Sequence, residues 1–584
     1  MRPRWSDDDR PRDEVAPQGG AGDDACVFPP AGGTGPGGAR EGRLLLVGEG
    51  EALRALTAAA ERAGCRDVRV RRRGGGDAEA PGGLPTWADG EALSAADAVL
   101  HVAGSAEESA ALADRCAEAG AWLGQVLVHG GELWTGPLGP ADRTGSASAW
   151  RRLRGLPPQG RPEGPSDGGA DGPVGAVLAA GRAEWIADRL LGAWLGRGDA
   201  GAADGGADSA GEARGRGALG GPGRAGEPHL VRTDVRTSSS SRHPVVPLPR
   251  PDRSGTRAGS ETGARVAFLG RIGGEAVEQA CLWERIEAVT DARTGLLGPV
   301  SEATPGPTGV WGCAVAVPDP FGPVPADAPA VTVWGRGSDA GSARLAAVLD
   351  ALAAYGTFAA APEARSGRDV WGLDLVTERL RRVPAAEAYA APASGTPYRL
   401  PTGVAAGLTW AAAVETALTR HCEALVTRRL AEPGVRVPRL ALPDHGGPAA
   451  LRALRAAGGP VAHDLTALLS VPACAVRLGD DTVVAVAATR SEALAVAAER
   501  ALLTRDMGVP PTGGEPFVPT VPPITPDREA AGRPLPVEDG ASRRAGLVEA
   551  LRAQGRTPVA VLLDHDPEAV RILPYLVQVV LSDG

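Results

Sequence analysis

The 584-residue chain contains no lysine and no asparagine, so all 61 of its basic residues are arginine. The missing lysine excludes a phosphate-loop lysine and a Schiff-base lysine, and the missing asparagine excludes that amide as a metal ligand. Aromatic residues make up only 4% of the chain, and no run of basic residues is interleaved with them. Together with the net charge of −10, this composition predicts that the protein does not bind nucleic acid.

Cysteine is scarce as well, and no two cysteines are close enough to form a CxxC pair. The seven cysteines are Cys26, Cys65, Cys116, Cys281, Cys313, Cys422 and Cys474. Their spacing predicts neither a zinc knuckle nor a disulfide framework. The charged N-terminus lacks the apolar stretch of a signal peptide, and no window approaches roughly 18 consecutive apolar residues. We therefore expect a cytoplasmic protein without a membrane partner.

Glycine and proline are abundant, with 82 and 52 residues, whereas 43% of the chain is hydrophobic. This balance is typical of compact cores joined by long linkers. We expect a disordered arm at 1–42, linkers at 155–173 and 198–228 around one amphipathic helix, and a proline-rich insertion at about 508–540. The length is consistent with roughly three or four domains.

Residues 43–154 have the pattern of a small doubly wound α/β domain. Leu44–Val47 predicts a buried strand, Gly48-Glu49-Gly50 a turn, and residues 51–63 a helix that ends at Gly64. The two glycines invite a dinucleotide interpretation, but Leu53 occupies the third glycine position, and no acidic residue ends the next strand. A tight strand-to-helix turn is the favoured interpretation.

From about residue 265 onward, short apolar strands alternate with long Ala-rich helices. The predicted helices lie at about 340–355, 409–430, 448–457 and 490–504, and the predicted strands at 310–317, 330–333, 483–486 and 559–563. The fold class is therefore α/β throughout. On the last of these helices, we interpret Glu499 and Arg500 as a pair on the helix surface.

Other motifs that carry chemistry are weak. Gly164-Pro-Ser166-Asp-Gly168 lies in a linker with no strand before it, so it does not predict a nucleophile elbow. His421 and Cys422 are neighbours on a predicted helix and point about 100° apart, which favours a packed helix face over a thiol–imidazole pair. Asp564-His565-Asp566 has residue types that bind metal, but a polar turn after a strand is the favoured interpretation.

Longer stretches, taken together, resemble the YcaO-domain family. Thr332–Tyr355 is similar to the family's GkG…EalERy segment, and Thr402–Glu423 to its sNGlAaGnt…ERd segment. Asp291–Leu296 resembles the opening strand and turn of the same domain, and Val461–Pro472 its later DlT…giP stretch. Without this resemblance, the region would be interpreted only as an unrelated Ala-rich α/β protein.

The N-terminal half resembles the ubiquitin-activating-enzyme-like (ThiF-like) domain that is fused to YcaO in azoline-forming cyclodehydratases. Gly136–Arg152 and His243–Gly255 are similar to the two stretches that carry a structural zinc in those proteins. The four cysteine positions correspond to Ser146, Ala149, Pro251 and Ser254. The resemblance therefore implies a ThiF-like domain at 43–260 and a YcaO-like domain at 261–584, with no zinc expected.

The resemblance also implies a reaction and its cofactors. YcaO cyclodehydratases use ATP and magnesium, held by paired glutamates and an asparagine, to convert Cys, Ser or Thr of a peptide to thiazoline or oxazoline. When the family's stretches are aligned with this chain, its first carboxylate pair corresponds to Asp350 and Ala353. Its second pair corresponds to Arg420 and Glu423, and its asparagine to Leu408. Asp350, Glu423 and Arg420 are therefore the candidate cofactor-binding residues; as plain helix carboxylates, the two acids would instead face solvent. For Glu499 and Arg500, the family position implies a wall of the cleft as the alternative to a pair on the helix surface.

Two functions follow from this resemblance to ribosomal-peptide (thiazole/oxazole, thiopeptide-type) biosynthesis. Lost cysteines, lost carboxylates and a C-terminus without the PxPxP tail favour a degenerate scaffold or partner subunit; the alternative is an active ATP/Mg-dependent cyclodehydratase. The implied partners are a precursor peptide, a separate leader-binding protein, an intact YcaO subunit and a second copy of the chain. If the family resemblance holds, the helices that bear Asp350 and Glu423 must face one cleft.

Overall fold

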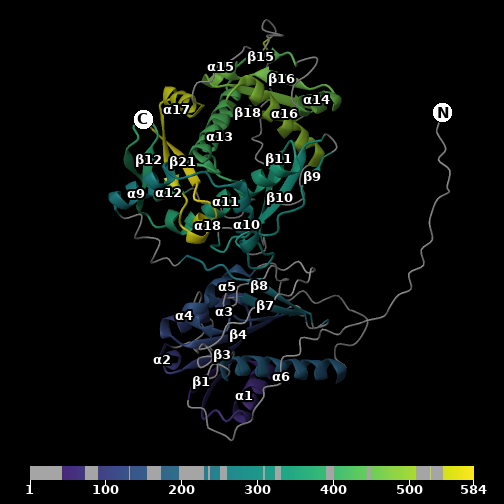
Figure 1. Ribbon diagram of the computed structural model, residues 1–584, viewed down its shortest axis with the longest axis vertical. Helices are drawn as coiled ribbons and strands as arrows, with labels where there is room; N and C mark the ends of the chain where they lie inside the picture. The colour runs from purple at the N-terminus through teal and green to yellow at the C-terminus, as the bar shows by residue number, and fades with distance from the viewer. Residues whose placement is uncertain are drawn as a thin grey trace, which may run out of the picture.

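The structure is a computed structural model. It describes residues 42–72, 90–129, 132–153, 173–195, 229–234, 237, 239–249, 260–306, 309–322, 330–389, 400–442, 449–479, 481–507, 526–527 and 543–583. The predicted N-terminal arm, nearly all of both predicted linkers and most of the proline-rich insertion lie outside these residues. Figure 1 shows two lobes, an N-terminal lobe (residues 42–249) and a C-terminal lobe (residues 260–583).

One mixed sheet forms the centre of the N-terminal lobe, with the strand order β2-β1-β3-β4-β5-β7-β8. Its strands are β1 (Arg43–Gly48), β2 (Asp67–Arg72), β3 (Ala98–Ala103), β4 (Trp122–His129), β5 (Glu132–Thr135), β7 (His229–Asp234) and β8 (Ser240–Pro244), and β6 (Gly139–Pro140) pairs with β4. The strands β2, β1, β3 and β4 are parallel, whereas β5, β7 and β8 extend the sheet in antiparallel fashion. The antiparallel half was not predicted, because its strands are short and two of them, β7 and β8, consist mainly of polar residues.

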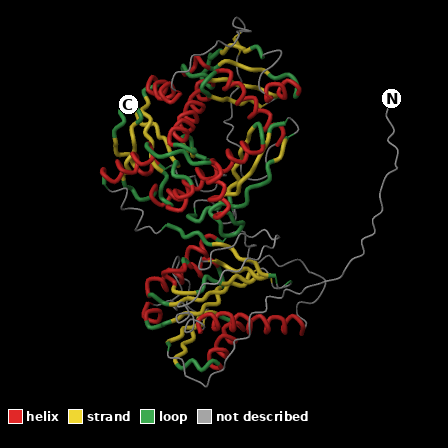
Figure 2. The backbone as a smooth tube through the Cα atoms, viewed as in Figure 1, coloured by secondary structure: helices red, strands yellow, loops and turns green. Residues whose placement is uncertain are grey.

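Helices cover both faces of this sheet (Figure 2). The helices are α1 (Gly50–Arg62), α2 (Gly90–Ser94), α3 (Ala106–Ala119), α4 (Ala141–Thr144), α5 (Ser146–Arg152) and α6 (Pro173–Leu195). Alternate residues of a strand face opposite sides, so Leu44 and Leu46 pack against α1 and α6, whereas Leu45 and Val47 pack on the side of α2 and α3. This two-sided burial explains the continuous apolar run of β1 and confirms the predicted α/β class.

The C-terminal lobe contains three further sheets, ordered β11-β10-β9, β13-β12-β20-β21-β14 and β18-β17-β16-β15-β19. Its strands are β9 (Thr304–Pro305), β10 (Trp311–Val317), β11 (Val331–Gly337), β12 (Asp369–Asp374), β13 (Leu380–Pro384), β14 (Val404–Ala406), β15 (Val437–Leu440), β16 (Val461–Asp464), β17 (Ala473–Leu478), β18 (Asp481–Val486), β19 (Pro526–Asp527), β20 (Arg556–Leu562) and β21 (Leu576–Asp583). Its helices are α9 (Glu261–Ile272), α10 (Gln279–Val289), α11 (Ala340–Ala364), α12 (Ala385–Ala388), α13 (Trp410–Leu430), α14 (Ala449–Ala456), α15 (Thr466–Leu469), α16 (Arg490–Met507), α17 (Arg543–Ala553) and α18 (Pro567–Ile572).

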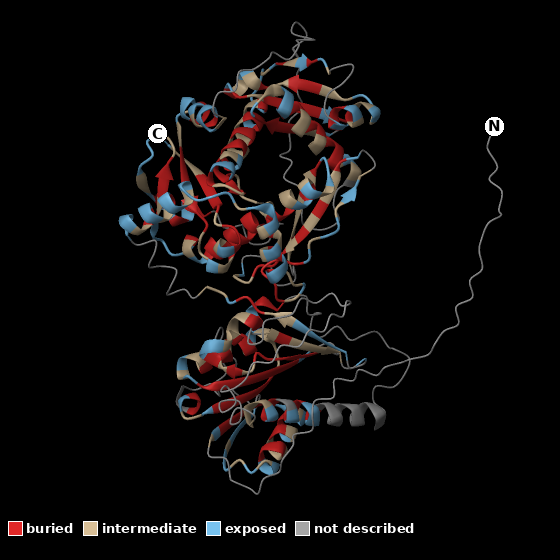
Figure 3. Cartoon of the chain, in the orientation of Figure 1, coloured by how far each residue is buried: buried red, intermediate tan, exposed pale blue. Residues whose placement is uncertain are grey.

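Helix α11 is the central helix of this lobe, and buried residues run along most of its length (Figure 3). Asp339 begins it with a capping box, in which its side chain accepts from the Ser342 N–H at 2.9 Å. Gly335 of β11 allows close packing, because a Cβ there would lie 2.1 Å from the Ala347 backbone nitrogen. Among the described helices, α11 alone is long and apolar enough to cross a membrane, and 72% of its most apolar window is buried inside the protein.

A buried polar network joins the two lobes. Arg152 of α5 is 1% exposed, and its guanidinium donates to the Val246 carbonyl at 2.5 Å and to the Tyr355 hydroxyl of α11 at 3.0 Å. The Tyr355 hydroxyl in turn donates to Asp566 at 2.5 Å, and Asp566 lies 3.5 Å from Arg152. Asp566 thereby balances the buried charge of Arg152, and the network fixes the end of α5 against α11.

Candidate functional site

The structure brings the three predicted site residues to one region of the C-terminal lobe. Asp350 is on α11, whereas Arg420 and Glu423 are one turn apart on α13. A side-chain ion pair links the two helices, because Arg420 Nη2 lies 2.5 Å from Asp350 Oδ1. Arg420 also donates to the Val404 carbonyl of β14. Asp350 is therefore engaged by a guanidinium and does not face solvent as a plain helix carboxylate would.

Glu423 is held by a second arginine. Its side chain is 3% exposed, and Oε1 accepts from Arg500 Nη1 at 2.7 Å and from the Val486 N–H at 3.2 Å. Arg500 comes from α16 and also donates to the Val484 carbonyl at 2.8 Å. The prediction that Arg500 pairs with Glu499 on the helix surface is therefore wrong, because Arg500 forms its ion pair with the buried Glu423. Sequence spacing could not show this, because α13 and α16 are far apart along the chain.

A third guanidinium completes the group, and sequence reasoning did not single it out. Arg336 lies between two glycines on β11, just before α11 begins. Burial, followed by the charge of the nearby Arg500, lowers the pKa of Arg336 to about 9, whereas Glu423 and Asp350 oppose this change. The position of Arg336 within the GkG-like stretch was the available signal. At neutral pH the group remains a cation.

Glu499 is the third acid of this cluster. Burial raises the pKa of its carboxyl, and the charges of Arg336 and Arg500 oppose the rise. Together with the two ion pairs, the cluster places three guanidinium groups among three carboxyl groups. Its charges nearly cancel, and the carboxylate oxygens of Asp350 and Glu423 already accept hydrogen bonds.

This arrangement does not fit a magnesium site as it stands. Mg²⁺ requires an octahedral set of oxygen ligands, and neighbouring guanidinium groups repel it. Asp350 and Glu423 would first have to release Arg420 and Arg500. Among the residues that the structure describes, no group of three or more His, Cys, Asp or Glu side chains is placed to hold a metal ion.

The positions that correspond to zinc ligands lie partly within the described residues. Ser146 and Ala149 are buried at successive turns of α5. The Ser146 hydroxyl donates to the Pro137 carbonyl at 3.3 Å and lies 2.9 Å from the Thr144 hydroxyl. These contacts pack α5 against the preceding loop. Pro251 and Ser254 lie outside the described residues, so the expected lack of zinc stays a prediction.

The weaker motifs have structural roles. His421 Nε2 lies 2.7 Å from the Val579 carbonyl, and burial lowers the pKa of this imidazole. Burial raises the pKa of the neighbouring Cys422 thiol to about 12, so its reactive thiolate is suppressed. At the turn after β1, a Cβ on Gly48 would lie 2.9 Å from the Val102 side chain, so glycine permits close packing of β1 on β3.

Comparisons with known proteins identify the fold. No family model matches the chain, and no curated protein matches it. A solved structure described as a heterocyclase in complex with substrate and cofactor superposes with a TM-score of 0.51 at 13% identity, covering 93% of this chain and 80% of that one. The heterocyclase TruD gives 0.46 at 15% identity over 93% and 79% of the two chains. YcaO from Methanopyrus kandleri, bound with AMPPCP and Mg²⁺, gives 0.34 at 16% identity over 49% and 85%.

The first of these likenesses shows that the chain has the overall fold of a heterocyclase. At 13% identity, it extends to the fold alone.

Proposed function

We propose that this chain is a degenerate YcaO-type protein of ribosomal-peptide biosynthesis, which supports azoline formation as a scaffold or partner subunit. The observation that carries the proposal is the pair of internal ion pairs, Arg420 with Asp350 and Arg500 with Glu423. They engage the two surviving carboxylates at the positions where the family resemblance places metal ligands. The heterocyclase fold supports assignment to this class of system.

The partners follow from this role. A scaffold needs an intact YcaO subunit for the chemistry, a precursor peptide as substrate, and a separate leader-binding protein that presents the peptide. This chain could associate with an intact YcaO subunit, or with a second copy of itself, through its complete fold. Such association does not require a complete metal site in this chain. The expected location is the cytoplasm.

The alternative, an active cyclodehydratase with ATP and magnesium, is favoured by Arg336. This cation lies near Asp350 and Glu423 at the start of α11. Arginine binds phosphate oxygens well. In this alternative, Arg336, Arg420 and Arg500 would hold the nucleotide phosphates, and Asp350 and Glu423 would hold the metal once they were free of their ion pairs.

Calorimetric titration with ATP and magnesium distinguishes the two functions. The unmodified chain is compared with Asp350→Ala and Glu423→Ala, and circular dichroism verifies that each protein is folded. We expect no saturable binding up to millimolar nucleotide. Saturable binding that both substitutions abolish would reject the scaffold and establish the alternative.

A reconstitution experiment tests the scaffold directly. A precursor peptide and an intact YcaO subunit are incubated with ATP, with and without this chain, and ring formation is followed as the loss of one water mass per azoline. We expect more ring formation when this chain is present than when it is absent. The Asp350→Ala variant should give the same increase as the unmodified chain. Dependence on Asp350 would show that the chain performs chemistry itself.

A further inference from the structure

Three polar side chains meet where strand β8 of the N-terminal lobe contacts the C-terminal lobe. Ser241 Oγ lies 2.9 Å from His243 Nε2, and His243 Nδ1 lies 3.1 Å from both carboxylate oxygens of Asp291. Ser241 and His243 are two residues apart on β8, so their side chains emerge on the same face of the strand. Asp291 comes from the turn that follows α10 in the other lobe.

The charge of Asp291 decides where the protons of this group lie. The Arg293 and Thr294 N–H groups donate to Asp291 Oδ1 at 2.8 and 2.9 Å. Burial raises the pKa of the Asp291 carboxyl, but these hydrogen bonds and the one from His243 outweigh burial, so the pKa lies below its usual value. An ionised carboxylate only accepts, so Nδ1 of the neutral imidazole carries the proton and Nε2 accepts from the Ser241 hydroxyl. In this arrangement, a histidine can take the proton of a serine nucleophile.

The imidazole and the carboxylate are held in place by their surroundings. The side chains of His243 and Asp291 are only 12% and 15% exposed, and the centre of the His243 ring lies 5.0 Å from that of the Trp134 ring. The Thr294 hydroxyl donates to the Pro244 carbonyl at 2.8 Å, which ties the turn that carries Asp291 to the end of β8. The base therefore needs no rearrangement before it acts.

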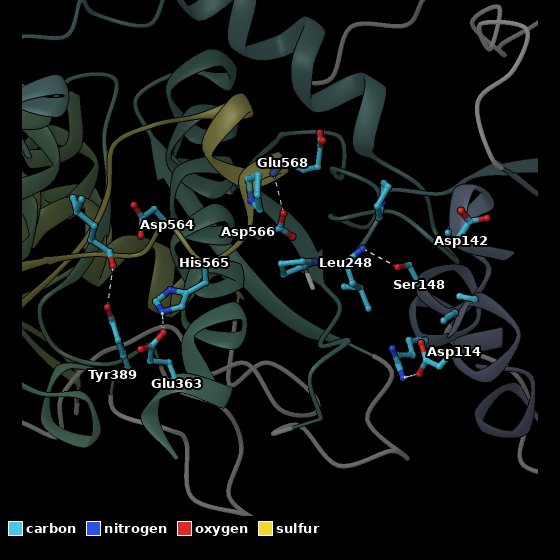
Figure 4. Close-up of a pocket in the computed structure, with 18 of the residues that line it drawn as sticks. Asp114, Asp142, Ser148, Leu248, Glu363, Tyr389, Asp564, His565, Asp566 and Glu568 are labelled. Carbon is cyan, nitrogen blue, oxygen red and sulfur yellow. Dashed lines mark hydrogen bonds and ion pairs between the residues drawn. The ribbon is translucent and has the colours of Figure 1, made fainter. Parts of the chain in front are cut away.

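The segment that follows β8 is anchored to α5. The Leu248 N–H donates to the Ser148 hydroxyl at 3.0 Å (Figure 4), and the Val246 carbonyl accepts from Arg152 at 2.5 Å. These contacts lie next to the polar network that joins the lobes. They fix the strand that carries the serine and the histidine relative to the lobe that carries the aspartate.

Ser241 is the accessible member of the group. The residue is exposed, so a substrate in solution can reach its hydroxyl. Within the described part of the sheet, β8 is an edge strand, and its backbone N–H groups that point away from β7 are donors for an oxyanion. At an exposed edge, water weakens the electrostatic stabilisation of a tetrahedral intermediate. A substrate with a good leaving group needs this stabilisation least, so the geometry favours activated esters.

We propose that Ser241, His243 and Asp291 form a second site, which hydrolyses activated carboxylic esters such as aryl esters. Ser241 Oγ attacks the carbonyl carbon while His243 Nε2 takes its proton, and Asp291 stabilises the imidazolium. The bond from the carbonyl carbon to the leaving oxygen breaks, the leaving alcohol takes the proton from Nε2, and an acyl ester of Ser241 remains. A water molecule, deprotonated by Nε2, then releases the carboxylic acid and restores the serine hydroxyl. The site shares no residue with the ion-pair cluster, so its failure would leave the proposed function intact.

A fluorophosphonate probe tests the nucleophile in the full chain, because it reacts with serines that a neighbouring base activates. We expect one phosphonate per chain, localised to Ser241 by tandem mass spectrometry, and none at this position in Ser241→Ala. Ser240→Ala is the matched control, since the Ser240 hydroxyl lies on the other face of β8, 3.0 Å from Thr233 Oγ1, and labelling should be unchanged. No labelling, or labelling at another serine alone, would overturn the proposal.

The rate of labelling tests the roles of the other two residues. His243→Gln should slow labelling of Ser241 by about 100-fold, because the general base is lost. Asp291→Asn should slow it by at least about tenfold, because the imidazole loses the carboxylate that orients it. Circular dichroism verifies that both variants are folded. An unchanged labelling rate in His243→Gln would show that the hydroxyl is not activated and would overturn the proposal.

Two further measurements separate catalysis from a purely structural contact between the lobes. The Nδ1 proton shared with Asp291 should give a low-field proton resonance in the NMR spectrum, which both His243→Gln and Asp291→Asn remove. Hydrolysis of p-nitrophenyl acetate by the unmodified chain should exceed that by Ser241→Ala at least about tenfold. Equal hydrolysis by the two proteins would reject the esterase activity, since Ser241→Ala retains the bond between His243 and Asp291.

Discussion

The two ion pairs of the candidate site differ in burial. Glu423 is 2% exposed, whereas Asp350 is only partly buried. A carboxylate that loses its partner inside the protein retains the full cost of its desolvation, whereas water compensates a carboxylate near the surface. The Arg500 pair should therefore matter more for stability than the Arg420 pair.

Arg500→Ala is expected to lower the free energy of unfolding by about 3 kcal/mol, and Arg420→Ala by about 1 kcal/mol. Urea denaturation followed by circular dichroism measures both. Arg552→Ala serves as control, because Arg552 and its partner Glu549 are largely exposed, and the substitution should change stability by less than about 0.5 kcal/mol. Equal losses for Arg500→Ala and Arg420→Ala would contradict the described burial.

Burial of His421 predicts a pH dependence of stability. Because burial lowers the pKa of His421 in the folded state, the unfolded chain binds its proton more readily as the pH falls through about 6.5. Stability from this residue is therefore complete above that pH and decreases below it. The stability difference between His421→Gln and the unmodified protein, measured at pH 7.5 and at about pH 5.5, should shrink at the lower pH. A constant difference would show that the imidazole pKa is not lowered.

Single residues of the site could be predicted only in part. Asp350, Glu423 and Arg420 were identified through stretches that resemble a family, and α11 and α13 do bring Asp350 and Arg420 into contact. Arg500 was assigned to a helix surface, since its partner depends on how α16 packs against α13. Such contacts have no local signature in the chain.

At the scale of elements, the strand β11 packs unusually close to α11. Gly335→Ala would place a methyl group 2.1 Å from a backbone nitrogen of α11. The contact is with backbone atoms, which cannot move aside as the end of a flexible side chain can. We expect a loss of about 3 kcal/mol or more in unfolding free energy, because the substitution overpacks a buried contact. Thermal unfolding measures this loss.

Gly546→Ala provides the matched control for that experiment. Gly546 is exposed within α17, and a Cβ there would meet no atom within 4 Å. Alanine should stabilise the helix by up to about 1 kcal/mol. A similar destabilisation in both variants would show that close packing is not the cause.

Element boundaries were predicted well where the hydrophobic pattern was strong. The predicted strand 310–317 matches β10, and the predicted helix 409–430 matches α13, each to within one residue. Helix α11 was expected to end near residue 355 but continues to Ala364. Gly356 does not stop it, because that glycine packs against the Leu563 side chain, a contact that local sequence cannot reveal.

At the scale of the whole molecule, Arg152 couples the unfolding of the two lobes. Arg152→Leu removes its bonds to Val246 and Tyr355 and leaves the Asp566 charge buried without its cation. We expect the main thermal transition to broaden or split in calorimetry, with a loss of about 3 kcal/mol. Arg151→Ala, at an exposed neighbour, should leave the shape of the transition unchanged. A sharp single transition in Arg152→Leu would show that other contacts join the lobes.

The α/β class of the molecule could be predicted because its strands and helices alternate along the chain. The junction between the lobes could not, since Arg152, Tyr355 and Asp566 lie in separate elements and none of them belongs to a recognisable motif. The antiparallel half of the first sheet escaped prediction because its strands are short and largely polar. Periodicity reports how one element meets its core, whereas the assembly of elements depends on contacts distant in sequence.

The shared network of Arg152, Tyr355 and Asp566 limits how this protein can be divided or recombined. A C-terminal lobe expressed alone would carry Asp566 beneath its surface without the cation that neutralises it, and a lobe grafted from a relative would have to supply a guanidinium at the same place. The two halves therefore cannot be exchanged as independent modules. Substitutions at any of these three positions should persist only when the other two change with them.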